Sequence, residues 1–142
     1  MAFKKEESAG YLINHLARLF AKELQKRIKP LGIVPGQFPV LLELWSKDGI
    51  TQRELLKEID VEQATLANTL TRMERDGLIR RTKHPADARS QQVWLTEKAS
   101  KVKAEAYRAA TQTNLDALSG LSDAEKALFI ELMKKIIDSM RP

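Results

Sequence analysis

Residues 65–97 of this 142-residue chain read TLANTLTRMERDGLIRRTKHPADARSQQVWLTE, and this stretch decides the fold. Its first part, within residues 62–75, repeats apolar side chains at three- and four-residue steps, which predicts an amphipathic helix. The apolar side consists of Leu66, Leu70 and Met73. Asp76 and Gly77 end this helix, because glycine readily takes the left-handed conformation that follows a helix C-terminus. The stretch therefore opens with a helix that has one buried and one free side.

A small hairpin is predicted after this helix. Leu78–Ile79 and the residues after them form one strand, and Val93–Leu95 form the other. The loop between the strands, Lys83–Ser90, contains Pro85 and is long for a hairpin. Residues 72–89 carry six basic and three acidic side chains, so the hairpin has a basic tip.

Another short helix precedes the 62–75 helix. Thr51 and Glu54 have the spacing of a capping box, in which each side chain bonds the other residue's free backbone N–H. A turn at Asp60–Val61 then separates the two helices. The order helix, turn, helix, hairpin is typical of a winged helix-turn-helix, which places its second helix in the DNA major groove.

Helices are also predicted on both sides of this unit. Their expected ranges are 8–29, 35–46, 97–118 and 122–140. In the second of them, one buried stripe is expected from Phe38, Leu41, Leu42 and Trp45. The predicted fold class is mainly α, an α+β winged helix, in a single domain spanning residues 1–142.

The polar side of the 62–75 helix is the candidate reading surface for DNA. Its candidate contact residues are Gln63, Thr65, Asn68, Thr69 and Arg72. Arginine can pair with guanine O6 and N7, asparagine with adenine N6 and N7, and a threonine methyl can meet the thymine methyl. The alternative is an ordinary solvated helix face.

Arg89 is the strongest single candidate for DNA contact in the hairpin loop. Its guanidinium can enter a narrow minor groove, with Asp87 two residues earlier holding it in position. The alternative is a surface ion pair, which contributes little. Arg81 and Lys83, together with Arg80, are expected to meet phosphates or to brace the hairpin.

These motifs resemble the MarR family of winged helix-turn-helix regulators. The resemblance rests on residues 65–81, on Asp87-Ala88-Arg89 and on residues 93–97, and the helical layout extends it over almost the whole chain. Two departures are small. Ala88 replaces a frequent second arginine in the wing. Ala99 stands where a glycine often follows the Leu-Thr pair, here Leu95-Thr96.

The resemblance implies an obligate homodimer on a pseudo-palindromic operator in double-stranded DNA. It implies a winged lobe at about 33–96 and dimerisation helices at about 8–30 and 97–140. The residues support this in part, since the last helix carries more apolar surface than one lobe needs. These apolar residues are Leu128, Phe129, Leu132, Met133, Ile136, Ile137 and Met140. The alternative is that the flanking helices only complete a monomeric core.

The resemblance also suggests a ligand crevice between the dimerisation helices and the winged lobe. Candidate lining residues are Tyr11, His15, Arg18, Phe38 and Trp45. Histidine and arginine would attract a small anionic or aromatic effector, and the rings would stack on it. Each has a simpler explanation, since Phe38 and Trp45 lie on a core stripe and a lone helical histidine is usually just hydrogen-bonded.

Composition excludes several classes of protein. The chain has 24 basic and 19 acidic residues, a net charge of +5, which favours polyanionic partners. It has no cysteine, so thiol enzymes, thiol redox switches and cysteine-ligated metals are excluded. His15 and His84 are the two histidines, so we expect no metal site and no cofactor. Because no apolar membrane segment or signal peptide is found either, a cytoplasmic location is expected.

The sequence thus predicts a cytoplasmic, homodimeric, sequence-specific transcription regulator, a repressor released by a small-molecule effector. The alternative is a sequence-indifferent architectural DNA-binding protein, which the basic composition also favours. A third possibility is a protein-docking role for the winged lobe. No enzyme is expected, because phosphate loops, nucleophile elbows and catalytic clusters are missing from the sequence.

Overall fold

The computed structural model describes residues 2–142 and contains seven α-helices and two strands over that range. In chain order they are α1 Ala9–Ile28, α2 Phe38–Ser46, α3 Gln52–Ile59, α4 Gln63–Arg75, β1 Ile79–Lys83, β2 Gln91–Leu95, α5 Glu97–Lys101, α6 Lys103–Ala117 and α7 Asp123–Met140. Short 3-10 turns lie at Lys5–Glu7, Lys29–Leu31 and Pro35–Gln37. The mainly helical winged-helix fold expected from the sequence is confirmed.

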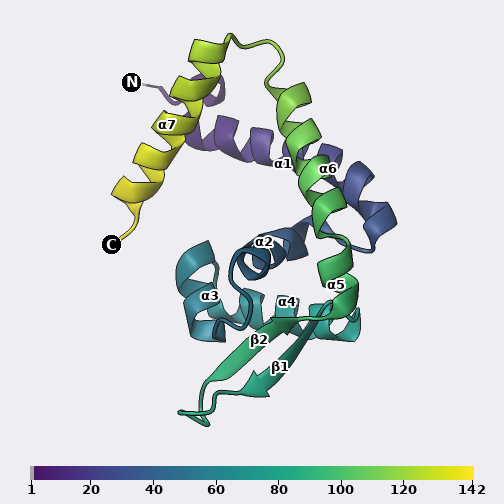
Figure 1. Ribbon diagram of the computed structural model, residues 1–142. Coiled ribbons are helices and arrows are strands. Elements are labelled where there is room, and N and C mark those ends of the chain that lie inside the picture. The colour runs from purple at the N-terminus through teal and green to yellow at the C-terminus, as the bar shows by residue number, and fades with distance from the viewer. Residues whose placement is uncertain (1) are drawn as a thin grey trace.

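The winged lobe, which we define as α2 to β2, occupies the lower half of Figure 1. Its core lies between α2, α3, α4 and the hairpin, where each amphipathic helix turns its apolar side inward. The most deeply buried side chains there are Leu41, Leu44, Leu55, Leu66, Leu70, Met73, Leu78 and Val93. Four of them, Leu55, Leu66, Leu70 and Met73, are apolar positions that give α3 and α4 their helical periodicity, so sequence pattern and burial agree there.

The hairpin is antiparallel, with Ile79 opposite Leu95 and Lys83 opposite Gln91. It is tied to the loop between α2 and α3 by backbone hydrogen bonds. The Gly49 N–H donates to the Val93 carbonyl at 3.0 Å, and the Val93 N–H donates to the Ile50 carbonyl at 2.9 Å. We call this hairpin with its loop, residues 79–95, the wing. Its base is therefore anchored to the loop between α2 and α3.

α1, α6 and α7 lie above the lobe in Figure 1, and α5 lies beside it. α1 runs against α6, where Arg27 donates to the buried Thr113 hydroxyl at 2.7 Å and also pairs with Asp116. α7 stands apart and buries none of its residues within the subunit. Its apolar side chains stay half-buried or exposed, Ile136 among them at 45% exposure.

Three details differ from the sequence-based expectations. Leu42 is 41% exposed, because the buried side of α2 includes Val40 and Leu44 and leaves Leu42 at its edge. The helix expected over 97–118 is broken at Val102 into α5 and α6. At Thr51 the expected capping box is only half formed. The Thr51 hydroxyl accepts from the Glu54 N–H, but the Glu54 carboxylate accepts from that same hydroxyl.

Trp45 is hydrogen-bonded to residues on both sides of the break at Val102. The Trp45 indole donates to the Ala99 carbonyl at 3.0 Å, and Lys103 Nζ donates to the Trp45 carbonyl at 3.3 Å. Both contacts tie the junction of α5 and α6 to the end of α2.

Of the helices described for residues 2–142, none combines the length and apolar character that crossing a membrane requires.

Candidate nucleic-acid interface

α3 and α4 are joined by a tight turn at Asp60. This residue has a φ of 53° and a ψ of 40°, the left-handed conformation, which closes α3. Aspartate adopts this conformation more readily than most residues that carry a side chain. The turn sets the direction in which α4 leaves, and α4 lies across the lobe beside the hairpin (Figure 1).

α4 has the two sides expected from the sequence. Leu66, Leu70 and Met73 are buried, whereas Thr65, Asn68 and Arg72 are exposed on the opposite side. Thr69 is half-buried, and its hydroxyl donates to the Thr65 carbonyl at 2.8 Å. Gln63 is exposed at the first turn of the helix. Thr65, Asn68, Thr69 and Arg72 therefore share one accessible side of α4, whereas Gln63 lies apart from them and lines the groove toward α3 and the wing.

The far end of α4 is held by the buried side chain of Gln37. Its Nε2 donates to Asp76 Oδ2 at 3.0 Å, and its Oε1 accepts from the Val34 N–H at 3.2 Å. The hydrogen bond from Gln37, followed by that from Arg75, lowers the pKa of the Asp76 carboxyl. Gly77 then turns the chain with a φ of 75° into β1. The C-terminal end of α4 is thus tied to the segment that precedes α2.

Asp87 organises the wing tip. Its Oδ1 accepts from the backbone N–H of Arg89 at 3.0 Å and from Arg89 Nε at 3.5 Å, and its Oδ2 accepts from the Ser90 hydroxyl at 3.3 Å. The backbone N–H of Arg89 is the main cause that lowers the pKa of the Asp87 carboxyl. The Arg89 side chain itself is 94% exposed. The tip therefore presents a guanidinium to solvent from a loop that is held by hydrogen bonds.

Arg81 is engaged inside the subunit. Its Nη2 donates to Glu74 Oε1 at 2.9 Å, and this hydrogen bond is the main cause that lowers the pKa of the Glu74 carboxyl. The Arg81 side chain is only 20% exposed. Of the two roles weighed for it, the structure shows the bracing contact, which joins β1 to α4. Arg80 lies over the Trp94 ring, 5.7 Å from its centroid.

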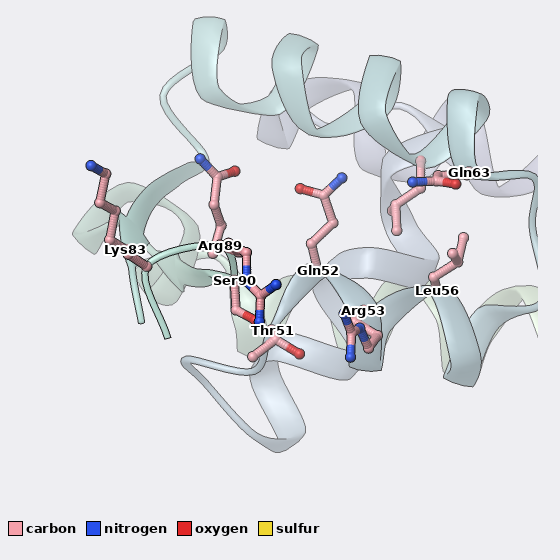
Figure 2. Close-up of a pocket in the computed structure, with 11 residues that line it drawn as sticks. Thr51, Gln52, Arg53, Leu56, Gln63, Lys83, Arg89 and Ser90 are labelled. Atoms are coloured by element: carbon pink, nitrogen blue, oxygen red, sulfur yellow. The ribbon is translucent and has the colours of Figure 1, made fainter. Parts of the chain in front are cut away.

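A groove of about 510 Å³ lies between α3, the start of α4 and the wing. Figure 2 shows Lys83, Arg89 and Ser90 reaching it from the wing, and Gln52 and Arg53 from α3. Gln63 also lines it, at the start of α4. Since three cationic side chains line this groove, it suits a polyanion such as a phosphate backbone.

Sequence reasoning missed Gln52, Arg53, Ser90 and Gln91, which also line this groove. A signal was present at the first two, because they follow the helix-capping Thr51 and sit where a helix N-terminus favours anions. Ser90 and Gln91 carry no comparable signal in the sequence.

The five candidate ligand residues are not brought together. Tyr11, His15 and Arg18 are exposed on α1, with the Tyr11 and His15 rings 6.1 Å apart. Phe38 and Trp45 are buried in the lobe, with their rings packed edge to face at 6.0 Å. None of the five lines any of the five main cavities among residues 2–142.

Known proteins resemble this chain in sequence and in structure. The family model of the MarR family matches residues 33–91. The chain is 36% identical over 125 residues to the transcriptional regulator HosA from Escherichia coli O111:H-, covering 88% of this chain and 87% of that protein. The helix-turn-helix, the hairpin and most of the flanking helices fall within these matches.

Solved structures share the arrangement. A MarR transcriptional regulator from Methanosarcina mazei Go1 superposes with a TM-score of 0.84 at 28% identity, covering 92% of this chain and 94% of that one. The reduced form of AbfR bound to DNA superposes with a TM-score of 0.72 at 26% identity, covering 92% and 91% of the two chains. The likeness therefore extends over the flanking helices as well as the winged lobe.

Proposed function

Because this chain belongs to the MarR family of winged helix-turn-helix regulators, we propose that it is a dimeric, sequence-specific repressor of transcription released by a small-molecule effector. The observation that carries the proposal is the exposed side of α4 beside a wing tip whose Arg89 is 94% exposed. AbfR, a structural neighbour, was solved bound to DNA, which supports duplex DNA as the partner. Because the proposed partner of this chain is duplex DNA, the proposed location is the cytoplasm.

α4 supplies the base-reading contacts in this proposal. Arg72 and Asn68 are exposed and carry the bidentate groups that recognise guanine and adenine in the major groove. Thr65 and Gln63 lie nearer the start of the helix and can reach bases or phosphates. The Thr69 hydroxyl already donates to the Thr65 carbonyl, so its contribution is an apolar contact or an acceptor.

The wing and the groove supply contacts that add affinity. Arg89 enters the minor groove of the DNA. Lys83 and Arg53 face the phosphate backbone from the two sides of the protein groove between α3 and the wing. Arg81 acts from behind, since its bond to Glu74 fixes the strand against the reading helix. The division is between residues that read sequence and residues that position the lobe.

The dimer is proposed to form through the helices outside the winged lobe, at about 8–30 and 97–140, leaving the lobe at about 33–96. An apolar groove of about 570 Å³ lies between α1, α6 and α7. It is lined by Ile13, Leu16, Phe20, Phe129, Met133 and Ile136, among others. Burying this surface against a second copy removes apolar area from water, which favours association.

The effector site is proposed to be completed by dimerisation. Tyr11, His15 and Arg18 share one exposed side of α1, at the three- and four-residue steps that bring side chains together. An anionic aromatic molecule would pair with the cation and stack on the rings. Phe38 and Trp45 would act only indirectly, because both are buried.

Selection of bound duplexes from a random pool tests the function. A regulator should enrich a two-fold symmetric site and prefer it over random duplex by roughly 10³ or more. An architectural protein would show no such preference. Failure to bind duplex, or binding that does not weaken with salt, would instead favour protein docking. Repeating the selection with aromatic acids tests release by an effector.

A further inference from the structure

Arg141, the residue after α7, contacts the turn of the helix-turn-helix. Its Nε donates to Asp60 Oδ2 at 2.6 Å, and its Nη2 donates to the Glu58 carbonyl at 2.8 Å. Asp60 is the left-handed residue between α3 and α4. The end of α7 is therefore bonded to the point from which the reading helix departs, 81 residues away in the chain.

This contact closes an arch that is visible in Figure 1. On one side, α6 and α5 lead down to the winged lobe, with their interruption at Val102. On the other side, α7 descends and ends near α3. Within residues 122–142, the hydrogen bonds and ion pairs of the other residues stay inside that segment, so Arg141 provides the polar attachment on this side.

We propose that Arg141 is a positioning residue for operator recognition. By bonding Asp60 and Glu58 it holds the winged lobe at one angle to α7, and so sets the separation of the two reading helices in the dimer. The inference rests on the proposed function, because it needs a dimer that reads two half-sites. A rigid lobe angle matters there, since half-sites lie about one helical turn of DNA apart.

The contact between Arg141 and Asp60 is strong enough to favour one angle between the winged lobe and α7 and weak enough to allow others. The Arg141 and Asp60 side chains remain 42% and 52% exposed, so water and salt weaken their attraction. Two bonds from one planar guanidinium nevertheless give a directional contact that a lysine ammonium does not reproduce. Removing it should therefore loosen the lobe and leave the fold intact.

The experiment uses the full chain with a single spin label per subunit. No native cysteine is present, so Ser46→Cys, at an exposed position at the end of α2 in the winged lobe and outside the proposed DNA contacts, gives one label site. In this background the variants are Arg141→Ala, Arg141→Lys and Asp60→Asn, and asparagine tolerates the left-handed turn. Lys135→Ala is the matched control, since it removes one positive charge from exposed α7.

Two quantities are measured for each variant. The first is the distribution of distances between the two labels in the dimer without DNA. The second is the affinity for the selected duplex, for the same duplex with one base pair inserted or deleted between its half-sites, and for random duplex. Thermal unfolding verifies that each variant is folded.

We expect Arg141→Ala and Asp60→Asn to broaden the distance distribution and to reduce the preference for the native spacing about two- to fivefold, the range of an exposed ion pair. Combining them should add little, and Arg141→Lys should lose part of the preference. Binding to random duplex and the Lys135→Ala control should match the parent. An Arg141→Ala dimer with the parental distances and spacing preference would overturn the inference, as would a uniform loss on all duplexes with unchanged distances.

Failure of the proposed function would be visible in the parent protein itself. A parent without dipolar coupling between labels is not a dimer, and a parent without preference for the selected duplex is not a specific regulator. Either result removes the inference together with its premise, whereas failure of the inference alone appears only in the variants.

Discussion

The carboxylate of Asp87 accepts a hydrogen bond from the backbone N–H of Arg89 at 3.0 Å, while the Arg89 side chain remains 94% exposed. One residue thus fixes the loop and the other extends from it. The arrangement separates the structural role of the wing tip from the DNA contact that we propose for it, and the two roles can be tested separately.

Substituting Arg89→Ala should weaken binding to every duplex that carries the operator by about 1.5–3 kcal/mol, the range of hydrogen bonds to charged groups. The loop should keep its shape, because Asp87 bonds the backbone N–H at position 89, which alanine retains. Titration of labelled duplex measures the loss. Arg89→Lys keeps the charge and should recover part of the affinity. Parental affinity in the alanine variant would show that the wing tip does not contact DNA.

Asn68→Ala should cost about 1–3 kcal/mol at one base pair of each half-site. The amide is exposed on α4 and lies on the side that carries Arg72. Competition with duplexes changed at single positions should show that the variant no longer discriminates at that pair. Thr71→Ala, on the same helix but off the reading side, serves as the control. Unchanged discrimination at all positions would remove Asn68 from the reading surface.

The order of the wing tip should depend on pH in the acidic range. The pKa of the Asp87 carboxyl is lowered in the folded chain. At a pH above the ordinary aspartate pKa, about 3.9, the carboxylate therefore keeps its hydrogen bonds to the loop, and it loses them as the pH falls through the lowered pKa. The NMR shift of the Arg89 amide reports this step. Asp87→Asn should abolish the step, and a midpoint at or above the ordinary value in the parent would contradict the prediction.

Placing a carboxylate on the apolar side of α7 should separate the subunits. Ile136→Asp puts a charge into the groove between α1, α6 and α7, where burial against a second copy would leave it unpaired. Sedimentation should then report one subunit per particle, and operator affinity should fall with it. Lys134→Asp, on the opposite side of the helix, should remain dimeric. A dimeric Ile136→Asp variant would place the interface elsewhere.

Gly49→Ala should destabilise the lobe. A Cβ at this position would lie 2.5 Å from the Trp94 ring, and the φ of 77° disfavours any side chain. Overpacking of this kind costs about 1–3 kcal/mol, which urea unfolding can measure. Gly120→Ala is the matched control, because a Cβ there meets nothing within 4 Å. Equal stability of the two variants would contradict this account of the contact.

The sequence predicted those parts of the fold that depend on neighbouring residues. The apolar side of α4 and the turn at Gly77 follow from spacing and backbone preference alone, and both are confirmed. The interruption at Val102 was not predicted, and the side chain bonded on both sides of it, Trp45, lies more than fifty residues earlier in the chain. The exposure of Leu42 likewise depends on which helices surround α2.

The candidate site divides in the same way. The exposed face of α4 and the Asp87–Arg89 pair were found from local spacing, and the structure places them on an accessible surface. The role of Arg53 and the contact of Arg141 with Asp60 both need the tertiary arrangement, which no local pattern encodes. The five candidate ligand residues do not lie together, because Phe38 and Trp45 fill the core whereas Tyr11, His15 and Arg18 are exposed on α1.

The bare apolar side of α7 also bears on how the protein is made. This helix follows every residue of the winged lobe in the chain, so a nascent polypeptide can complete and fold its DNA-reading part before the adhesive surface leaves the ribosome. The order of translation thereby shortens the time for which the apolar side of α7 is exposed without a folded lobe attached to it.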